Sequence, residues 1–454
     1  MKGRTRWVAA LVLCLPALTP ARASAQTSDQ ATALARAVRA AVTPEALDRH
    51  AREITRWPRP SGSPGENAAT DYVVATLRAA GVDVEVHEFM AYTSNPVSAE
   101  VTVPGTDFAP DAITLSFSGA TDDLEANVVD VGTLDDLPDL EVGTGERLTV
   151  RDAERFARVR GKIALVTGQP RNVPTAALQR LGAVAVVYVN PEERLNDLIV
   201  TTTWGTPSLL DYQRLDILPT AQIRRSDGDR LRALMRAGEV RVRVRTVVDT
   251  GWKPLRLAVA RVMPTGATPA TPYVLFGGHI DAWYHGGTDE GASNAAMLEL
   301  ALAFNANRDK MRRGLVVAWW PGHSNARYAG STWFADHFFE ELRLRGIAYV
   351  NVDGIGQKDA KRYGVSTSPA LGALAVGVVA RATGETPGNG RPGRNSDQSF
   401  NGIGIPLLQI NHSRLEEDGG YWWWHTPDDT YDKIDADVLE TDTELYADAL
   451  AALT

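Results

Sequence analysis

The chain has 454 residues, of which 44% are hydrophobic and 23% are charged, and its formal net charge is −9. This composition is typical of a globular protein with two domains, or with one large domain and an insertion. The acidic charge argues against a nucleic acid as the partner, because phosphate binding needs a basic surface. Cys14 is the only cysteine, so we expect neither a disulfide nor a thiolate ligand in the mature protein.

The first 25 residues have the organisation of a secretory signal peptide. Basic residues precede an apolar run from Trp7 to Leu18, and Ala23-Ser-Ala25 follows that run. The run is shorter than the about 20 apolar residues that a membrane-spanning helix needs. We therefore predict cleavage after Ala25, a secreted or periplasmic location, and no membrane span in the mature protein.

The elements expected after residue 25 begin with helices and then change in character. The early helices cover 31–42, 44–54 and 66–79, and a strand follows over 82–89. From residue 115 to 249 short β-like runs dominate, with one short helix over 175–181, and no histidine occurs there. We interpret 115–249 as a β-rich inserted domain without catalytic residues of its own.

Strands and helices alternate from residue 255 onward. The strand candidates are the apolar runs 255–262, 273–278, 315–320, 347–352 and 405–410. The helix candidates are 292–305, 330–345, 369–382 and 436–452. This alternation predicts an α/β domain, formed by 26–114 and 250–454, with a mostly parallel mixed sheet covered by helices on both faces.

Histidines and aspartates follow the ends of these strands. The residues in these positions are His279, Asp281, Asp289, His323, Asp353, His412 and His425. Carboxyl ends of parallel strands meet at one edge of a sheet, so we expect these side chains to converge. Imidazole and carboxylate groups are ligands of catalytic zinc, and one carboxylate, here Asp289, can bridge two ions. Asp281 is expected to fix the tautomer of the His279 imidazole through its carboxylate.

Several motifs resemble those of the M28 family of zinc-dependent peptidases, which includes bacterial aminopeptidases and glutamate carboxypeptidase. They are GGHID (277–281), GTDEGAS (287–293), GSTW (330–333), NVD (351–353), SD (396–397) and HTPDDT (425–430). Residues 59–77 are similar to the opening loop and helix of the family, and 115–249 resembles its protease-associated insert. The resemblance implies one zinc ion held by His279, Asp289 and Asp353, and a second held by Asp289, His425 and a glutamate. It also implies a neighbouring glutamate as general base and a cis peptide bond between Asp289 and Glu290.

The glutamate pair of the family is missing from this sequence. After the strand 315–320 the chain reads Pro321-Gly-His-Ser-Asn-Ala-Arg327. His323 could replace the ligand glutamate, completing a second site with Asp289 and His425, because imidazole suits zinc well. It could instead replace the base, because a neutral imidazole accepts a proton near neutral pH. In a third account both functions are lost and the protein binds without cleaving.

We favour the first account, in which metal-bound water alone or another carboxylate acts as base; the candidates are Glu290, Glu416 and Glu417. Arg327, Trp424 and His285 are the candidate substrate contacts. The sequence thus predicts an exported hydrolase of peptide bonds with one or two zinc ions, and in the first place an aminopeptidase. Hydrolysis of a non-peptide amide and metal-containing binding without catalysis are the alternatives.

Overall fold

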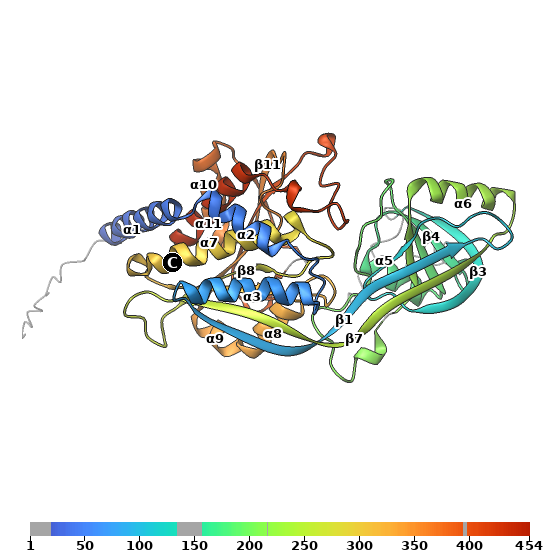
Figure 1. Cartoon of the computed structure of the whole chain (residues 1–454), viewed down its shortest axis with the longest axis horizontal. Helices are drawn as coiled ribbons and strands as arrows, with labels where there is room; N and C mark the ends of the chain where they lie inside the picture. The colour runs from blue at the N-terminus through green and yellow to red at the C-terminus, as the bar shows by residue number, and fades with distance from the viewer. Residues whose placement is uncertain (1–19, 134–156, 216, 394–396) are drawn as a thin grey trace, which may run out of the picture.

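The computed structural model describes residues 20–133, 157–215, 217–393 and 397–454 (Figure 1). Its N-terminal elements are α1 (Pro20–Ala41), α2 (Pro44–Ile54), α3 (Pro64–Ala79) and the long strand β1 (Asp83–Thr102). The predicted signal peptide lies mostly in residues 1–19, outside the described part, and α1 already begins before the predicted cleavage site. Within the described residues, no helix combines the length and the apolar character that crossing a bilayer requires.

A mixed, mostly parallel sheet forms the larger part of the molecule, as predicted. Its strands are β7 (Arg241–Val262), β8 (Tyr273–His279), β9 (Gly314–Trp320), β10 (Gly346–Asn351), β11 (Arg362–Thr367), β12 (Gly388–Gly390) and β13 (Leu407–Ser413). The order is β12-β11-β13-β10-β8-β9-β7, and the four strands from β13 to β9 are parallel. Strands β7 and β11 pair antiparallel with β9 and β13, respectively.

Helices cover both faces of this sheet, and the central strands β8 and β9 are therefore buried on both sides. The helices of the C-terminal part are α7 (Ala292–Ala306), α8 (Ala329–His337), α9 (Phe339–Arg345), α10 (Gly372–Thr383) and α11 (Ala436–Leu453). Side chains of β8 alternate between two apolar cores: Val274 and Phe276 pack in the core shared with α7 and α11, and Leu275 packs on the side of α8. The sheet edge that carries the candidate site is therefore held in place from two sides.

A second lobe projects from the sheet on two long strands. β1 and β7 pair antiparallel along nearly their whole lengths and run from the sheet into this lobe (Figure 1). The lobe holds β2 (Ile113–Thr114), β3 (Thr121–Thr133), β4 (Ile163–Thr167), α5 (Asn172–Arg180), β5 (Ala185–Val189), β6 (Thr220–Ile223) and α6 (Arg225–Ala237). Strand β2 lies before residue 115 but pairs with β6 of this lobe. The boundary of the inserted domain between residues 114 and 115 stays a prediction.

Several elements differ from the prediction, and strand β11 is one that was not expected. Helix α6 was not expected, because its buried face is small: only Gly228 and Leu231 are fully buried among polar neighbours. The predicted helix 330–345 is two helices that meet at Phe338. Strand β13 continues to Ser413, so His412 lies within a strand and not after it.

Glu66, in the first turn of α3, is a buried carboxyl group whose protonation state can be tested. Ser63 caps this helix, and the Glu66 carboxylate accepts a hydrogen bond from the Gly62 backbone N–H at 2.6 Å. Burial, and after it the negative charge of Asp281, raise the pKa of Glu66 well above its usual range. The fold therefore favours the neutral acid: its stabilising contribution is present below the unfolded pKa of about 4.5 and is lost as the pH rises.

We expect Glu66→Gln to stabilise the fold at pH 8 relative to the parent chain, by about 0.5–3 kcal/mol, and to have less effect at pH 4–5. Glutamine keeps an acceptor for the Gly62 N–H but cannot ionise. Urea unfolding of both chains at the two pH values measures the difference. Parallel pH dependences in the two chains would mean that Glu66 does not titrate as proposed.

Candidate metal centre

His279 ends strand β8 and is the centre of a buried polar cluster. The two preceding glycines are required by close packing, since a Cβ atom on Gly278 would lie 2.7 Å from the carbonyl oxygen of Val352. The His279 Nδ1 atom lies 2.7 Å from the backbone carbonyl oxygen of Asp281. A carbonyl oxygen only accepts, so Nδ1 carries the proton and donates. Nε2 of the neutral ring then presents a lone pair.

That lone pair faces carboxylates. His279 Nε2 lies 3.2 Å from Asp289 Oδ1 and 3.8 Å from Glu290 Oε1, yet it makes no hydrogen bond within the described structure. Burial alone would lower the pKa of His279, but the surrounding carboxylates, Asp289 foremost, raise it to about 10. The cluster therefore favours a positive charge at this point, which a proton or a metal cation supplies.

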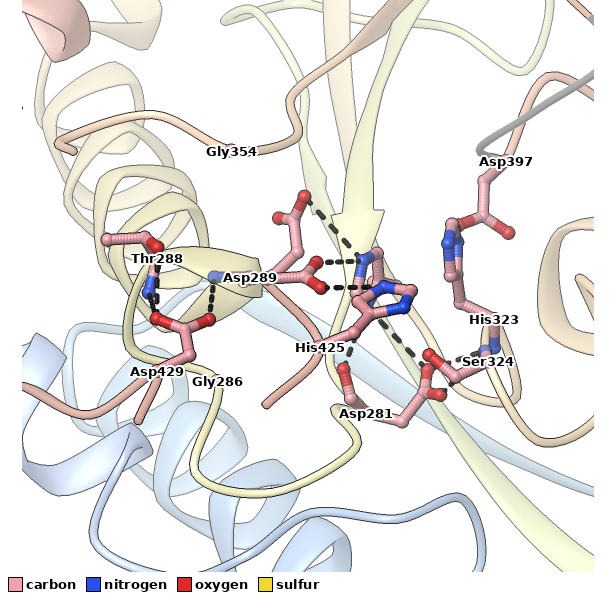
Figure 2. Close-up of polar contacts among 12 residues, drawn as sticks. Asp281, Gly286, Thr288, Asp289, His323, Ser324, Gly354, Asp397, His425 and Asp429 are labelled. Carbon is pink, nitrogen blue, oxygen red and sulfur yellow. Dashed lines mark hydrogen bonds and ion pairs between the residues drawn. The ribbon is translucent and has the colours of Figure 1, made fainter. Parts of the chain in front are cut away.

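Asp289 is placed between two imidazoles. Its Oδ2 atom lies 3.1 Å from His425 Nε2 (Figure 2), and its Oδ1 atom faces His279 Nε2. Burial would raise the pKa of Asp289, but the two histidines hold it well below its usual range. Each carboxylate oxygen thus meets its own imidazole, the arrangement that a carboxylate bridging two ions needs.

Asp353, which follows β10, and Glu290 complete the cluster. Ligand atoms of His279, Asp289, Glu290 and Asp353 all lie within 4.8 Å of one another. Both carboxylate oxygens of Glu290 are buried and accept no hydrogen bond from the described residues. Burial, followed by the charge of Asp353, raises the pKa of Glu290 well above its usual range. The peptide bond between Asp289 and Glu290 is cis, as the resemblance predicted.

This donor set fits a zinc ion. Imidazole nitrogen and carboxylate oxygen are its common ligands, and acceptor atoms buried without donors are what a bound cation would satisfy. The sequence reasoning singled out His279, Asp289, Asp353 and His425, and the structure brings His279, Asp289 and Asp353 together, with His425 against Asp289.

Supporting residues position the ligands, and sequence reasoning gave them no role. The Asp429 carboxylate accepts hydrogen bonds from the backbone N–H groups of Thr288 and Asp289, at 2.9 and 3.1 Å, and so holds the turn that carries Asp289 (Figure 2). The guanidinium of Arg59 is fully buried and donates to backbone carbonyl groups, among them those of Ile280 and Gly286 at 2.9 and 3.1 Å. Both residues lie in motifs that the resemblance quoted, which was the available signal.

Asp281 supports the site in a different way from the one expected. Its carboxylate Oδ1 is 3.9 Å from His279 Nδ1, too far for a hydrogen bond, and its backbone carbonyl makes that contact. The carboxylate accepts instead from the backbone N–H groups of His323 and Ser324, both at 2.9 Å. Asp281 thus joins the end of β8 to the segment after β9.

His323 stands beside His279. The two rings stack with centroids 3.8 Å apart, and His323 Nδ1 lies 2.9 Å from Oδ2 of the buried Asp397 (Figure 2). Ligand atoms of His323, His279 and Asp353 lie within 4.8 Å of one another. In the described part of the chain no such group joins His323 to His425, so the expected trio of Asp289, His323 and His425 is not assembled. Ser396, which precedes Asp397 in the predicted motif, lies outside the described residues.

The second lobe holds the remaining ligand. His425 Nδ1 lies 2.5 Å from the carbonyl oxygen of Asp197, and the Asp197 N–H donates to the His425 carbonyl at 3.0 Å. Asn196 donates to the carbonyl of Trp424 at 2.7 Å, and the Trp424 ring stacks on the His425 ring with centroids 3.7 Å apart. The predicted insert therefore contributes backbone groups of Asp197 and the side chain of Asn196 to the site, and none of its described residues belongs to the ligand cluster.

A pocket of about 580 Å³ opens onto this cluster. Two predicted substrate contacts, Arg327 and Trp424, line it together with Asp289, Asp353, His323 and His425. His285 is not in its lining; its Nδ1 donates to the carbonyl of Thr55 at 2.9 Å. Glu416 and Glu417 are exposed and also lie outside the lining, so of the three predicted carboxylate bases only Glu290 lies at the cluster.

An α/β sheet with histidine and carboxylate ligands at its carboxyl edge defines a class of proteins that bind a metal ion there. Residues 259–450 match the model of peptidase family M28. Over these residues the chain is similar to this family, as its motifs predicted.

Relatives and solved structures agree with this placement. An aminopeptidase of Pseudomonas aeruginosa (strain UCBPP-PA14) is 28% identical over 66% of this chain and 54% of its own length. Human transferrin receptor protein 2 is 28% identical over 41% of this chain and 26% of its own length. The chain thus spans about half of the aminopeptidase and about a quarter of transferrin receptor protein 2. A zinc aminopeptidase from Bacillus subtilis has the same fold, with a TM-score of 0.65, 19% identity, and coverage of 89% of this chain and 93% of its own.

Proposed function

We propose that the protein is a zinc-dependent hydrolase of peptide bonds, and specifically an aminopeptidase. The observation that carries the proposal is the placement of Asp289 between the Nε2 atoms of His279 and His425 in a buried carboxylate cluster. The likeness to two proteins named as aminopeptidases supports the specific activity. The sequence features of a signal peptide support export, and those of 115–249 support a protease-associated-like insert.

In this proposal His279, Asp289 and Asp353 hold one zinc ion, with Glu290 as a further acceptor beside it. His425 and the second oxygen of Asp289 offer part of a second site. Zinc, when bound, would polarise the carbonyl group of the scissile bond and lower the pKa of a water molecule. The chain itself orients the ligands, since the carbonyl groups of Asp281 and Asp197 each fix one imidazole tautomer.

We further propose that His323 acts as the general base in place of the missing glutamate pair. The arrangement of a histidine held by a buried carboxylate supports this role: Asp397 accepts a hydrogen bond from Nδ1–H and leaves Nε2 free to accept a proton. Nε2 would take a proton from the attacking water and deliver it to the leaving amine. A ligand role for His323, with His279 and Asp353, is the alternative that the same distances allow.

The test compares metal-free and zinc-loaded protein on a panel of substrates. We expect chelation to abolish the hydrolysis of peptides with a free N-terminus, and added zinc to restore it. Hydrolysis confined to acylated amines would favour a non-peptide amide as the substrate. Absence of any zinc-dependent turnover would favour a binding protein, the candidate that the missing glutamate pair and the likeness to a receptor support.

A further inference from the structure

Arg327 is a buried cation that forms no ion pair with an acidic residue in the described part of the chain. Its side chain belongs to the segment after β9, and the residue is only 8% exposed. Its Nε atom is buried without a hydrogen bond, and no carboxylate of the described residues forms an ion pair with it. A guanidinium removed from water without a counter-charge is costly, so a site of this kind favours the binding of an anion.

Aromatic rings hold the guanidinium in place. Its central carbon lies 4.5 Å from the ring centroid of Tyr328 and 5.5 Å from that of Trp204, which comes from the second lobe. Contacts of this type fix the plane of the guanidinium, whose Nε atom makes no hydrogen bond with the described residues. The Arg327 guanidinium is thus preorganised for ligand binding.

Arg327 lies close to the metal cluster and opens on the same pocket. The rings of His279 and His323 stack at 3.8 Å, and those of His323 and Tyr328 meet at 4.8 Å. Two rings therefore separate His279 from the Arg327 guanidinium. Since an extended peptide advances about 3.5 Å per residue, a group bound by Arg327 would lie within a few residues of the scissile bond.

The charges in the pocket lining point the same way. Its described acidic residues are Asp289 and Asp353, and both are members of the metal cluster. Its described basic residues, besides the histidines, are Arg327 and Arg171, the latter from the second lobe. The part of the lining away from the cluster therefore attracts a negatively charged group of the substrate.

We propose that Arg327 binds the free carboxylate of the substrate, and that the protein acts on short peptides, in the first place dipeptides, whose C-terminal carboxylate lies next to the scissile bond. This inference rests on the proposed peptidase function and specifies its substrate class. No charge is transferred and no bond is made at Arg327: the residue positions the peptide and selects for its length.

The experiment uses the zinc-loaded full chain and three substrates: Leu-Leu, Leu-Leu-amide and Leu-Glu-amide. We expect kcat/KM for Leu-Leu to exceed that for Leu-Leu-amide by about 10- to 100-fold, mainly through KM. We expect Arg327→Gln to remove this preference, while Arg343→Gln, at an exposed position of α9, keeps it. Equal rates for Leu-Leu and Leu-Leu-amide in the parent chain would overturn the proposal, even if Arg327→Gln failed to fold. A preference for Leu-Glu-amide over Leu-Leu would assign Arg327 to a side-chain carboxylate and would also overturn it.

Calorimetry separates this proposal from the peptidase function itself. Binding of Leu-Leu and of Leu-Leu-amide is compared in the metal-free protein, where no turnover interferes. Tighter binding of Leu-Leu that Arg327→Gln abolishes would support the carboxylate site even if no peptide is hydrolysed. Hydrolysis of all three substrates at equal rates would leave the peptidase function standing and remove the carboxylate site.

Discussion

Replacing His279 with alanine is expected to remove bound zinc and to abolish peptide hydrolysis. The imidazole is buried, its tautomer is fixed by the Asp281 carbonyl, and its Nε2 atom faces Asp289 at 3.2 Å. Without it the cluster keeps three carboxylates but loses its central nitrogen ligand. We expect a loss of kcat/KM at least as large as the about 10²–10⁴-fold typical of removing a general base.

The measurement combines zinc content per chain with kcat/KM on a dipeptide. His337→Ala is the matched control, because His337 is exposed on α8 and lies outside the pocket. A His279→Ala chain that keeps full zinc content and full activity would contradict the proposed metal centre. Circular dichroism of both variants checks that any loss does not arise from unfolding.

Replacing His323 with alanine is expected to lower kcat by about 10²–10⁴-fold and to leave zinc bound. The reason is that a base transfers protons without holding the ion. Asp397→Asn should lower kcat in the same direction but less, because it removes the acceptor that orients the ring, at 2.9 Å, and keeps the ring itself. KM should change little in both variants, since neither side chain is assigned to substrate binding.

Zinc content decides between the two accounts of His323. If His323→Ala loses zinc together with activity, His323 is a ligand of the ion held by His279 and Asp353. If it keeps both zinc and kcat, His323 is neither base nor ligand, and Glu290 becomes the remaining carboxylate candidate at the cluster. His337→Ala serves again as the control for an unspecific effect of removing a histidine.

The central sheet could be predicted because its signals are local. The apolar runs at 273–278 and 315–320 are buried on both faces in β8 and β9. A continuous apolar run predicts such burial without any knowledge of the neighbouring strands. Helix α6 could not be predicted in this way, because its packing depends on Gly228 lying against Val189, a contact with a strand 39 positions away. Strand β11 was not predicted for a related reason: its pairings with β12 and β13 are tertiary contacts.

The ligands could be predicted because strand ends place them at one edge. The hydrogen bonds that orient these side chains could not be predicted from the sequence. Asp281 and His279 are two residues apart, but only the folded backbone shows that the carbonyl, and not the carboxylate, receives Nδ1. The support of His425 by Asp197 joins residues 228 positions apart in the chain.

The sequence by itself therefore indicated the fold class, through the periodicity and residue types of short segments. Its resemblance to the M28 family implied His279, Asp289, Asp353 and His425 as candidate ligands. Only the tertiary structure placed His323 beside His279 and against Asp397, 74 residues away, and Arg327 between rings from two parts of the molecule. The physical reason is that a hydrogen bond or an aromatic contact between distant segments depends on how those segments pack, and no local pattern encodes that distance.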